Sequence, residues 1–204
     1  MYIADGYQNE NEQEITEFLK TNSFGILINQ VDGKPWATHI PLELDVNEKG
    51  EKVLFGHIAK ENPQWKSFAS DNKILAVFSG PHAYISSSWY DHENVPTWNY
   101  IAVHVYGSIK IIEGEAMLAS LKKLVDKYES ASENPIRIED LSKRTMLQTR
   151  GIVAFEILIE DIQAVKKMSQ NRNQKDYANI ISELEKTAKP DTIAVAEIMS
   201  KCPR

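Results

Sequence analysis

The chain has little of what marks secreted, membrane-spanning or metal-thiolate proteins. Among its 204 residues there is one cysteine, Cys202, which by itself forms neither an intrachain disulfide nor a thiolate metal site. The longest apolar runs, Ile26–Ile28 and Ile74–Phe78, are far shorter than the roughly 20 residues that span a bilayer. The N-terminus also lacks the basic and then apolar layout of a signal peptide. We therefore expect a cytoplasmic protein with no membrane partner.

Positive charge is also in short supply. The chain has 23 Lys and Arg against 29 Asp and Glu, a formal net charge of −6. Nucleic-acid binding draws most of its affinity from Lys and Arg that neutralise phosphates, so a broad DNA-binding face is not expected. Two small basic clusters remain as candidates for local DNA contact, with a solvated surface as the competing interpretation: Lys122, Lys123 and Lys127, and Lys166, Lys167, Arg172 and Lys175.

The common catalytic and nucleotide-binding motifs are missing. The sequence has no GxGxxG or Walker-type glycine run, no GxSxG elbow and no Cys/His nucleophile pair. Its five histidines are scattered, without HExxH or a cysteine at zinc-ligand spacing, so we predict no metal site. His39, His57 and His82 lie at or near expected strand ends, where they either hydrogen-bond a ligand or play structural roles.

Short β-type runs dominate the first half of the chain. After a helix expected at Glu14–Leu19, β-branched and aromatic residues between turn signals predict six strands. These are Phe24–Gln30, Trp36–Leu44, Lys52–Ile58, Lys73–Ser79, Ala83–Trp89 and Tyr100–Ile112. Because turns rather than long helices join most of them, the pattern favours an antiparallel barrel, mainly β with peripheral helices (α+β), over a doubly wound sheet.

Helical spacing returns in the second half. An apolar stripe from Met117 to Tyr128 predicts a core-facing helix, followed by a second helix at Glu139–Gln148 and a strand at Ile152–Ile159. A polar run and two helices separated near Pro190 come last. We expect a domain over residues 1–165 with inserted helices, and a C-terminal segment over 166–204 that packs on the barrel or on a dimer partner.

Two stretches have the composition of a ligand site. In Gly56–Trp65 a strand end is followed by Lys60 and by a helix that opens at Pro63, which is suited to an anion because the lysine and free N–H groups meet there. An exposed lysine before a capped helix is the competing interpretation. Ser79–Ser86 and Val95–Tyr100 form an aromatic rim where a flat ligand would sit.

These blocks resemble the PaiB family, described as FMN-binding negative transcriptional regulators and similar in fold to the FMN-binding split barrels of the pyridoxamine-phosphate-oxidase type. Matching blocks occur in the same order along most of the chain. They are Met1–Tyr2, Asn22–Gly25, Ala37–Leu42, Gly56–Trp65, Ser79–Ser86, Val95–Gly107 and Lys167–Arg172. Ala4, where the family often has proline, is a small departure.

The resemblance implies a split β-barrel and a homodimer, with FMN bound between the two subunits. It places Thr38 and His39 near the ring or ribityl chain, His57 and Ile58 beside the ring, and Lys60 on the phosphate, with Asn62 as a further polar contact. Ser169, Gln170, Asn171 and Arg172 would close the pocket, from the same or from the other subunit, with Arg172 as a second cation. Trp98 and Tyr84 either pack at the edge of the pocket or serve the fold.

The function implied is that of an FMN-binding, PaiB-like negative transcriptional regulator. The alternative is a small FMN-dependent oxidoreductase that uses NAD(P)H, in which the protein orients and tunes the flavin. Haem binding through a histidine is a third and weaker alternative. No residue stands out as a general acid or base, so the sequence identifies no catalytic residue.

Overall fold

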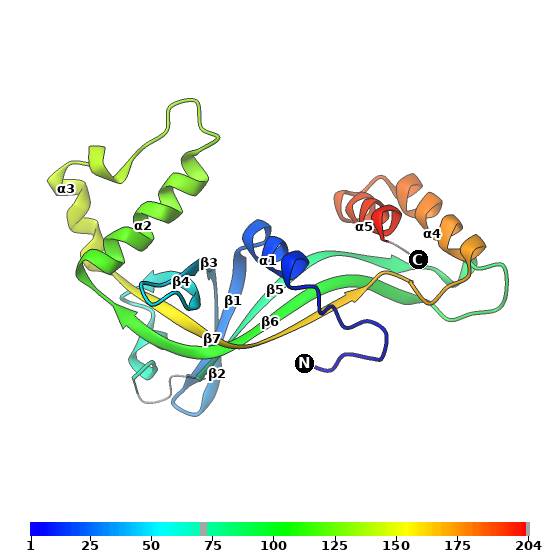
Figure 1. Cartoon of the computed structure of the whole chain (residues 1–204), viewed down its shortest axis with the longest axis horizontal. Coiled ribbons are helices and arrows are strands. Elements are labelled where there is room, and N and C mark those ends of the chain that lie inside the picture. Colours follow the sequence, from blue (N-terminus) through cyan, green and yellow to red (C-terminus); the bar gives the residue numbers. More distant parts are fainter. Residues whose placement is uncertain (70–72, 203–204) are drawn as a thin grey trace. The chain divides into compact units, whose positions relative to one another are not determined.

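Within residues 1–69 and 73–202, which the computed structural model describes, seven strands form one sheet in the order β2-β1-β5-β6-β7-β4-β3 (Figure 1). The β1–β2, β1–β5, β3–β4 and β4–β7 pairings are antiparallel. The strands are β1 (Phe24–Val31), β2 (Lys34–Pro41), β3 (Glu43–Val46), β4 (Lys52–Ala59), β5 (Lys73–Ile85), β6 (Thr97–Ile112) and β7 (Ile152–Lys167). None of the helices that the structure describes has the length and hydropathy of a membrane span.

The first hairpin shows how local sequence sets the sheet. Along β1 buried and more exposed residues alternate, which is the pattern of a strand with one face on the core. The β1–β2 turn consists of Asp32 and Gly33, whose φ angles are 51° and 73°. Two positive φ angles make a turn whose twist suits an antiparallel hairpin. The register that follows pairs Val31 with Lys34 and Leu27 with Thr38.

The predicted break between two strands at Gly80–Pro81 is wrong, because β5 continues through both residues. Proline cannot donate a ladder hydrogen bond, so it is tolerated only where a strand has no neighbour on its N–H side. The pairing of β5 with β1 covers Leu75–Val77 and ends before Pro81. The predicted strand end at Ser87–Trp89 is instead a 3₁₀ turn, η2, with the Ser86 hydroxyl as its N-cap.

The chain divides into two compact units, each built from several pieces of sequence. Unit 1 comprises Met1–Phe18, Ser79–His104 and Gln163–Arg204, and unit 2 comprises Leu19–Phe78 and Val105–Ile162. The predicted boundary after residue 165 separates two continuous stretches of sequence, whereas the two compact units are defined by contacts. The predicted boundary therefore stays a prediction.

Unit 1 contains most of α1 (Glu12–Thr21) and the two predicted C-terminal helices, α4 (Gln174–Thr187) and α5 (Pro190–Lys201). In its apolar core the last residue of β5, Ile85, packs with Ile180 of α4 and Val195 of α5, and all three side chains are fully buried. Burial of such aliphatic side chains is the main favourable contribution to folding.

Residues 113–151 of unit 2 depart from expectation. They hold α2 (Gly114–Glu129), η3 (Ile138–Asp140), α3 (Lys143–Met146) and η4 (Leu147–Gly151), and none of these residues, all of which the structure describes, is buried. The predicted core-facing stripe of α2 is therefore only half-buried in the single chain, and two of its members, Leu118 and Tyr128, are exposed. The second predicted helix is also broken into short turns, because the Ser142 hydroxyl accepts the Thr145 N–H and starts a new turn there.

Candidate functional site

A pocket of about 480 Å³ in unit 2 lies beside Lys60. Two cations, Lys60 and Arg150, line it together with the Trp65 indole. The remaining lining residues are Ile111, Ile112, Glu113, Gly114, Met117, Thr149, Ile152, Val153 and Ala154. The two cations outweigh the single carboxylate of Glu113, so the lining is suited to an anion with an apolar neighbour.

The end of the β4–β7 ladder brings the two cations to one pocket. Ile58 on β4 pairs with Val153 on β7, and Ala59 pairs with Ile152. Just beyond this ladder, the Lys60 N–H donates to the Gly151 carbonyl over 2.8 Å. Lys60 therefore follows the end of β4, Arg150 precedes the start of β7, and these two strand ends are paired. The Trp65 Nε1–H donates to the Lys60 carbonyl over 2.9 Å, which fixes the turn between them.

Thr38 and Asn62, both predicted to contact FMN, lie side by side. The Asn62 Nδ2 donates to the Thr38 hydroxyl over 2.9 Å, and that hydroxyl donates to Gln64 Oε1 over 2.6 Å. The helix expected to open at Pro63 is a five-residue 3₁₀ turn, η1 (Pro63–Ser67), and Asn62 Oδ1 accepts the Gln64 N–H as its cap. That N–H group is therefore not free for an anion, contrary to prediction.

The other predicted residues of unit 2 differ in accessibility. His39 is exposed on β2, where it pairs with Ile26. The Ile58 side chain is 2% exposed, so only its backbone remains for a ligand. His57 is half-buried on β4, and burial lowers the pKa of its imidazole below the ordinary value of 6.5. His57 is therefore neutral at physiological pH.

The four predicted residues of the 169–172 run belong to unit 1, and their described contacts are structural. Ser169 is buried with a φ of 56°, and its hydroxyl donates to the buried Asn99 Oδ1 over 3.0 Å. Gln170 donates to the Gly6 and Lys166 carbonyls, and Asn171 is exposed. The Arg172 guanidinium lies 5.0 Å from the Tyr90 ring centroid. Closure of the pocket by this run stays a prediction.

The predicted aromatic edge is an exposed cluster in unit 1. The Trp98 ring lies 5.9 Å from the Tyr84 ring and 6.0 Å from the His82 ring. Tyr84 and Trp98 are each about half exposed. The cluster is thus a surface feature of β5 and β6, and its contact with a ligand stays a prediction.

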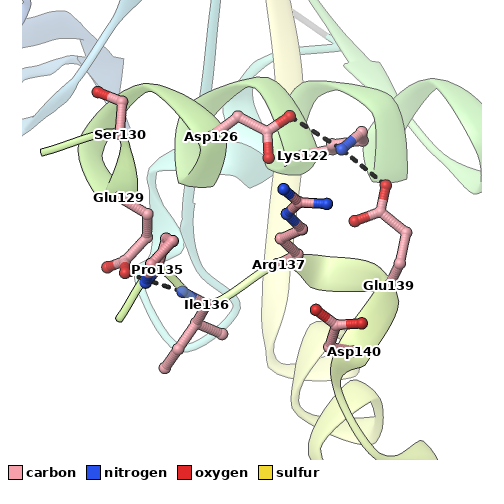
Figure 2. Close-up of a pocket in the computed structure, with 9 residues that line it drawn as sticks. All are labelled: Lys122, Asp126, Glu129, Ser130, Pro135, Ile136, Arg137, Glu139 and Asp140. Atoms are coloured by element: carbon pink, nitrogen blue, oxygen red, sulfur yellow. Dashed lines mark hydrogen bonds and ion pairs between the residues drawn. The ribbon is translucent and has the colours of Figure 1, made fainter. Parts of the chain in front are cut away.

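Carboxylates neutralise much of both basic clusters. Lys122 lines a charged pocket of about 620 Å³, and its Nζ lies 2.9 Å from an Asp126 oxygen and 2.6 Å from a Glu139 oxygen. Figure 2 shows Lys122 between these two carboxylates. The other pairs are Lys123 with Asp45, Lys127 with Glu43, Lys166 with Glu14 and Lys175 with Asp91. Carboxylates beside these lysines lower the positive potential of both clusters, so the geometry gives a DNA-binding role no support.

The sequence matches the family model described as "Putative FMN-binding domain" over residues 1–161, and the chain belongs to this family. It is 44% identical over 201 residues to "Protease synthase and sporulation protein PAI 2" of Bacillus subtilis, covering 98% of this chain and 96% of that protein. A fungal relative, "Uncharacterized protein AN0679" of Emericella nidulans, is 28% identical and is covered to 90%, with 91% of this chain aligned.

Solved structures share the fold at low sequence identity. The FAD and haem binding protein from Mycobacterium smegmatis superposes with a TM-score of 0.63 at 17% identity, covering 84% of this chain and 79% of that one. The flavocytochrome Anf3 from Azotobacter vinelandii gives 0.64 at 14% identity, covering 87% and 78%. Together these matches confirm the predicted PaiB resemblance and the mainly β, α+β split-barrel fold, and the predicted FMN cofactor agrees with the description of the family.

Sequence reasoning missed Arg150, Thr149 and Gln64. Thr149 and Arg150 lie in η4, and Gly151 separates them from β7, so the signal that was available is a cation shortly before a long apolar strand. Gln64 belongs to the Gly56–Trp65 block, but only its complete burial shows that it supports Thr38.

Proposed function

We propose that this chain binds FMN with the phosphate in the pocket of Lys60 and Arg150. The observation that carries the proposal is the meeting of two cations, Lys60 and Arg150, in one pocket. Asn62, two residues after Lys60 in the chain, connects this region to Thr38 by a hydrogen bond. An ammonium offers three donors and a guanidinium a planar fork, a donor set that fits a phosphate dianion. The predicted contacts of Thr38, His39, His57, Ile58 and Asn62 with the ring and ribityl chain form part of the proposal.

Bound FMN would supply one- or two-electron transfer, and the protein supplies binding and shielding. Lys60 and Arg150 hold the phosphate, while the apolar lining of the pocket, including Met117 and Val153, excludes water around it. Exclusion of water lowers the local dielectric constant and strengthens the attraction between the cations and the phosphate. The neutral imidazole of His57 would then lie beside the ring without adding a charge.

Equilibrium titration of the apoprotein with FMN and with riboflavin, followed by quenching of flavin fluorescence, tests this. Charge-assisted hydrogen bonds contribute about 1.5–3 kcal/mol, so Lys60→Ala and Arg150→Ala should each weaken FMN binding by about tenfold or more. Riboflavin, which lacks the phosphate, should bind both variants as it binds the unaltered chain. Lys66→Ala is the matched control, because Lys66 is exposed on η1 and does not line the pocket. Equal losses for both flavins would contradict the phosphate assignment.

We infer that the chain acts as a homodimer. Support comes from the split-barrel resemblance and from residues 113–151, where an amphipathic helix exposes Leu118 to 38% and Tyr128 to 51%. Exposed apolar side chains on one face of a helix mark an interaction surface, so a second subunit is expected to cover these residues. Leu118→Glu should lower the dimer fraction in light scattering at low micromolar concentration and leave the monomer folded. An unaltered chain that stays monomeric at high concentration would refute the inference.

We propose a negative regulatory role in transcription that does not require a DNA-binding face of its own. The paired basic clusters and the acidic net charge support the indirect route. An electrophoretic shift assay with genomic fragments over a salt series should show no specific complex. A specific complex with a steep salt dependence would overturn the indirect route. Rapid reduction of bound FMN by NAD(P)H with turnover to an acceptor would favour the oxidoreductase alternative instead.

A further inference from the structure

Two backbone groups fix the direction of a chain of hydrogen bonds in unit 2. The Leu27 carbonyl can only accept, so the Gln64 atom that faces it at 3.2 Å is Nε2, and Gln64 Oε1 must face Thr38. The Gln64 N–H can only donate, so the Asn62 atom that faces it at 3.1 Å is Oδ1, and Asn62 Nδ2 must face Thr38. Neither amide can be reversed without opposing like groups.

The Thr38 hydroxyl lies between these two amides. A hydroxyl has one proton and two lone pairs. The proton goes to Gln64 Oε1 over 2.6 Å, and one lone pair accepts Asn62 Nδ2 over 2.9 Å. One lone pair therefore remains on a side chain that is half-buried rather than fully enclosed. The hydroxyl is left as an acceptor and has no proton to offer.

A third amide holds Gln64 in this orientation. Gln64 is fully buried, and its Nε2 also donates to Asn29 Oδ1 over 3.0 Å. The opposite atom, Asn29 Nδ2, is buried and has no partner among the residues that the structure describes. Reversal of Asn29 would place its NH₂ group against the NH₂ group of Gln64. A buried polar atom without a partner is costly. Asn29 therefore leaves its own Nδ2 unpaired while its Oδ1 holds Gln64 in the orientation that Thr38 requires.

We propose that Gln64 is a positioning residue of the flavin site, which commits the Thr38 proton away from the ligand so that Thr38 accepts a hydrogen bond from it. The inference rests on the proposed function. FMN offers such donors at the ring N3–H and at the ribityl hydroxyls. Groups that only accept, such as the ring carbonyl oxygens, find no donor in this hydroxyl. The site thereby distinguishes ligands by the direction of one hydrogen bond.

A double-mutant cycle on FMN affinity tests the proposal. Thr38→Val, which keeps the shape and removes the hydroxyl, should weaken FMN binding by about tenfold, whereas Thr38→Ser should stay within about threefold. Gln64→Met should also weaken binding, because Thr38 is then free to turn its proton toward the ligand. In the Thr38→Val background the same Gln64 substitution should have little further effect.

Ligand analogues separate the two donor sources. 3-Methyl-FMN lacks the N3–H, and deoxy analogues of FMN each lack one ribityl hydroxyl. The unaltered chain should bind one class about tenfold more weakly than FMN, and Thr38→Val and Gln64→Met should lose that discrimination. Urea unfolding of each apoprotein shows whether the variant is folded, and Gln30→Met, an exposed position on β1, is the matched control.

The outcomes are distinct. An unaltered chain that binds no FMN overturns the proposed function and with it the role of Gln64 toward a flavin. Normal FMN binding with additive effects of Thr38→Val and Gln64→Met overturns the positioning role alone. Equal affinities for FMN and for every analogue would also overturn the positioning role, because Thr38 would then accept no hydrogen bond from the flavin.

Discussion

Gly107 on β6 lies where a side chain cannot be accommodated. A Cβ atom built there would lie 2.2 Å from the Leu158 carbonyl oxygen and 2.9 Å from Ile157 Cγ2, both on β7. The nearer contact is with backbone, so a rotamer change cannot relieve it and the two strands must move apart. Overpacking costs about 1–3 kcal/mol and occasionally more, and a backbone clash belongs at the upper end. For a chain of this size, about 3 kcal/mol corresponds to a loss of about 6–12 °C in Tm.

Thermal and urea unfolding of Gly107→Ala, followed by circular dichroism, measures this loss. Gly151→Ala is the matched control, because a Cβ atom at Gly151 meets nothing within 4 Å and the residue has no positive φ. The control should change the free energy of unfolding by less than about 1 kcal/mol in either direction. If Gly107→Ala melts within 1–2 °C of the control (about 0.5 kcal/mol), the close approach of β6 and β7 is not as described.

Two further predictions concern buried polar groups. Burial lowers the pKa of His57, so the unfolded chain binds the proton more readily, and stability should be complete above pH 6.5 and fall as the pH drops below it. Urea unfolding between pH 5.5 and 8 should show a shallower decline for His57→Gln, and an unchanged decline would exclude His57 as its source. Ser169→Ala leaves the fully buried Asn99 Oδ1 without its hydroxyl donor and should cost about 1–3 kcal/mol in the free energy of unfolding. A cost near zero would mean that this hydrogen bond is replaced.

The fold was predictable where local pattern decides it. The strand predicted at Phe24–Gln30 and the two helices predicted on either side of Pro190 follow from residues within those elements or next to them. The errors arose where a distant neighbour decides. Whether Pro81 breaks β5 depends on where the pairing with β1 ends. The α2 stripe indicates an amphipathic helix but not what lies opposite it.

The candidate site divides in the same way. Lys60 was recognisable because it follows a strand end within one block of sequence. Arg150 reaches the same pocket through the register of β4 with β7, which no local pattern encodes. The Ser169–Arg172 run matched a family block, yet its described contacts hold unit 1 together. A match to a family block does not say whether its residues bind the ligand or stabilise the fold.

Strands β5, β6 and β7 each pass from one compact unit into the other, with the division at Phe78–Ser79, His104–Val105 and Ile162–Gln163. The fourth border, Phe18–Leu19, lies within α1. No single cut in the polypeptide can therefore release either half as an intact piece, and a cut at any of the four borders interrupts a strand or a helix. Limited proteolysis should yield no stable fragment that ends at these borders, and a gene truncated at any of them should give insoluble product. Neither half is encoded by one continuous stretch of the sequence.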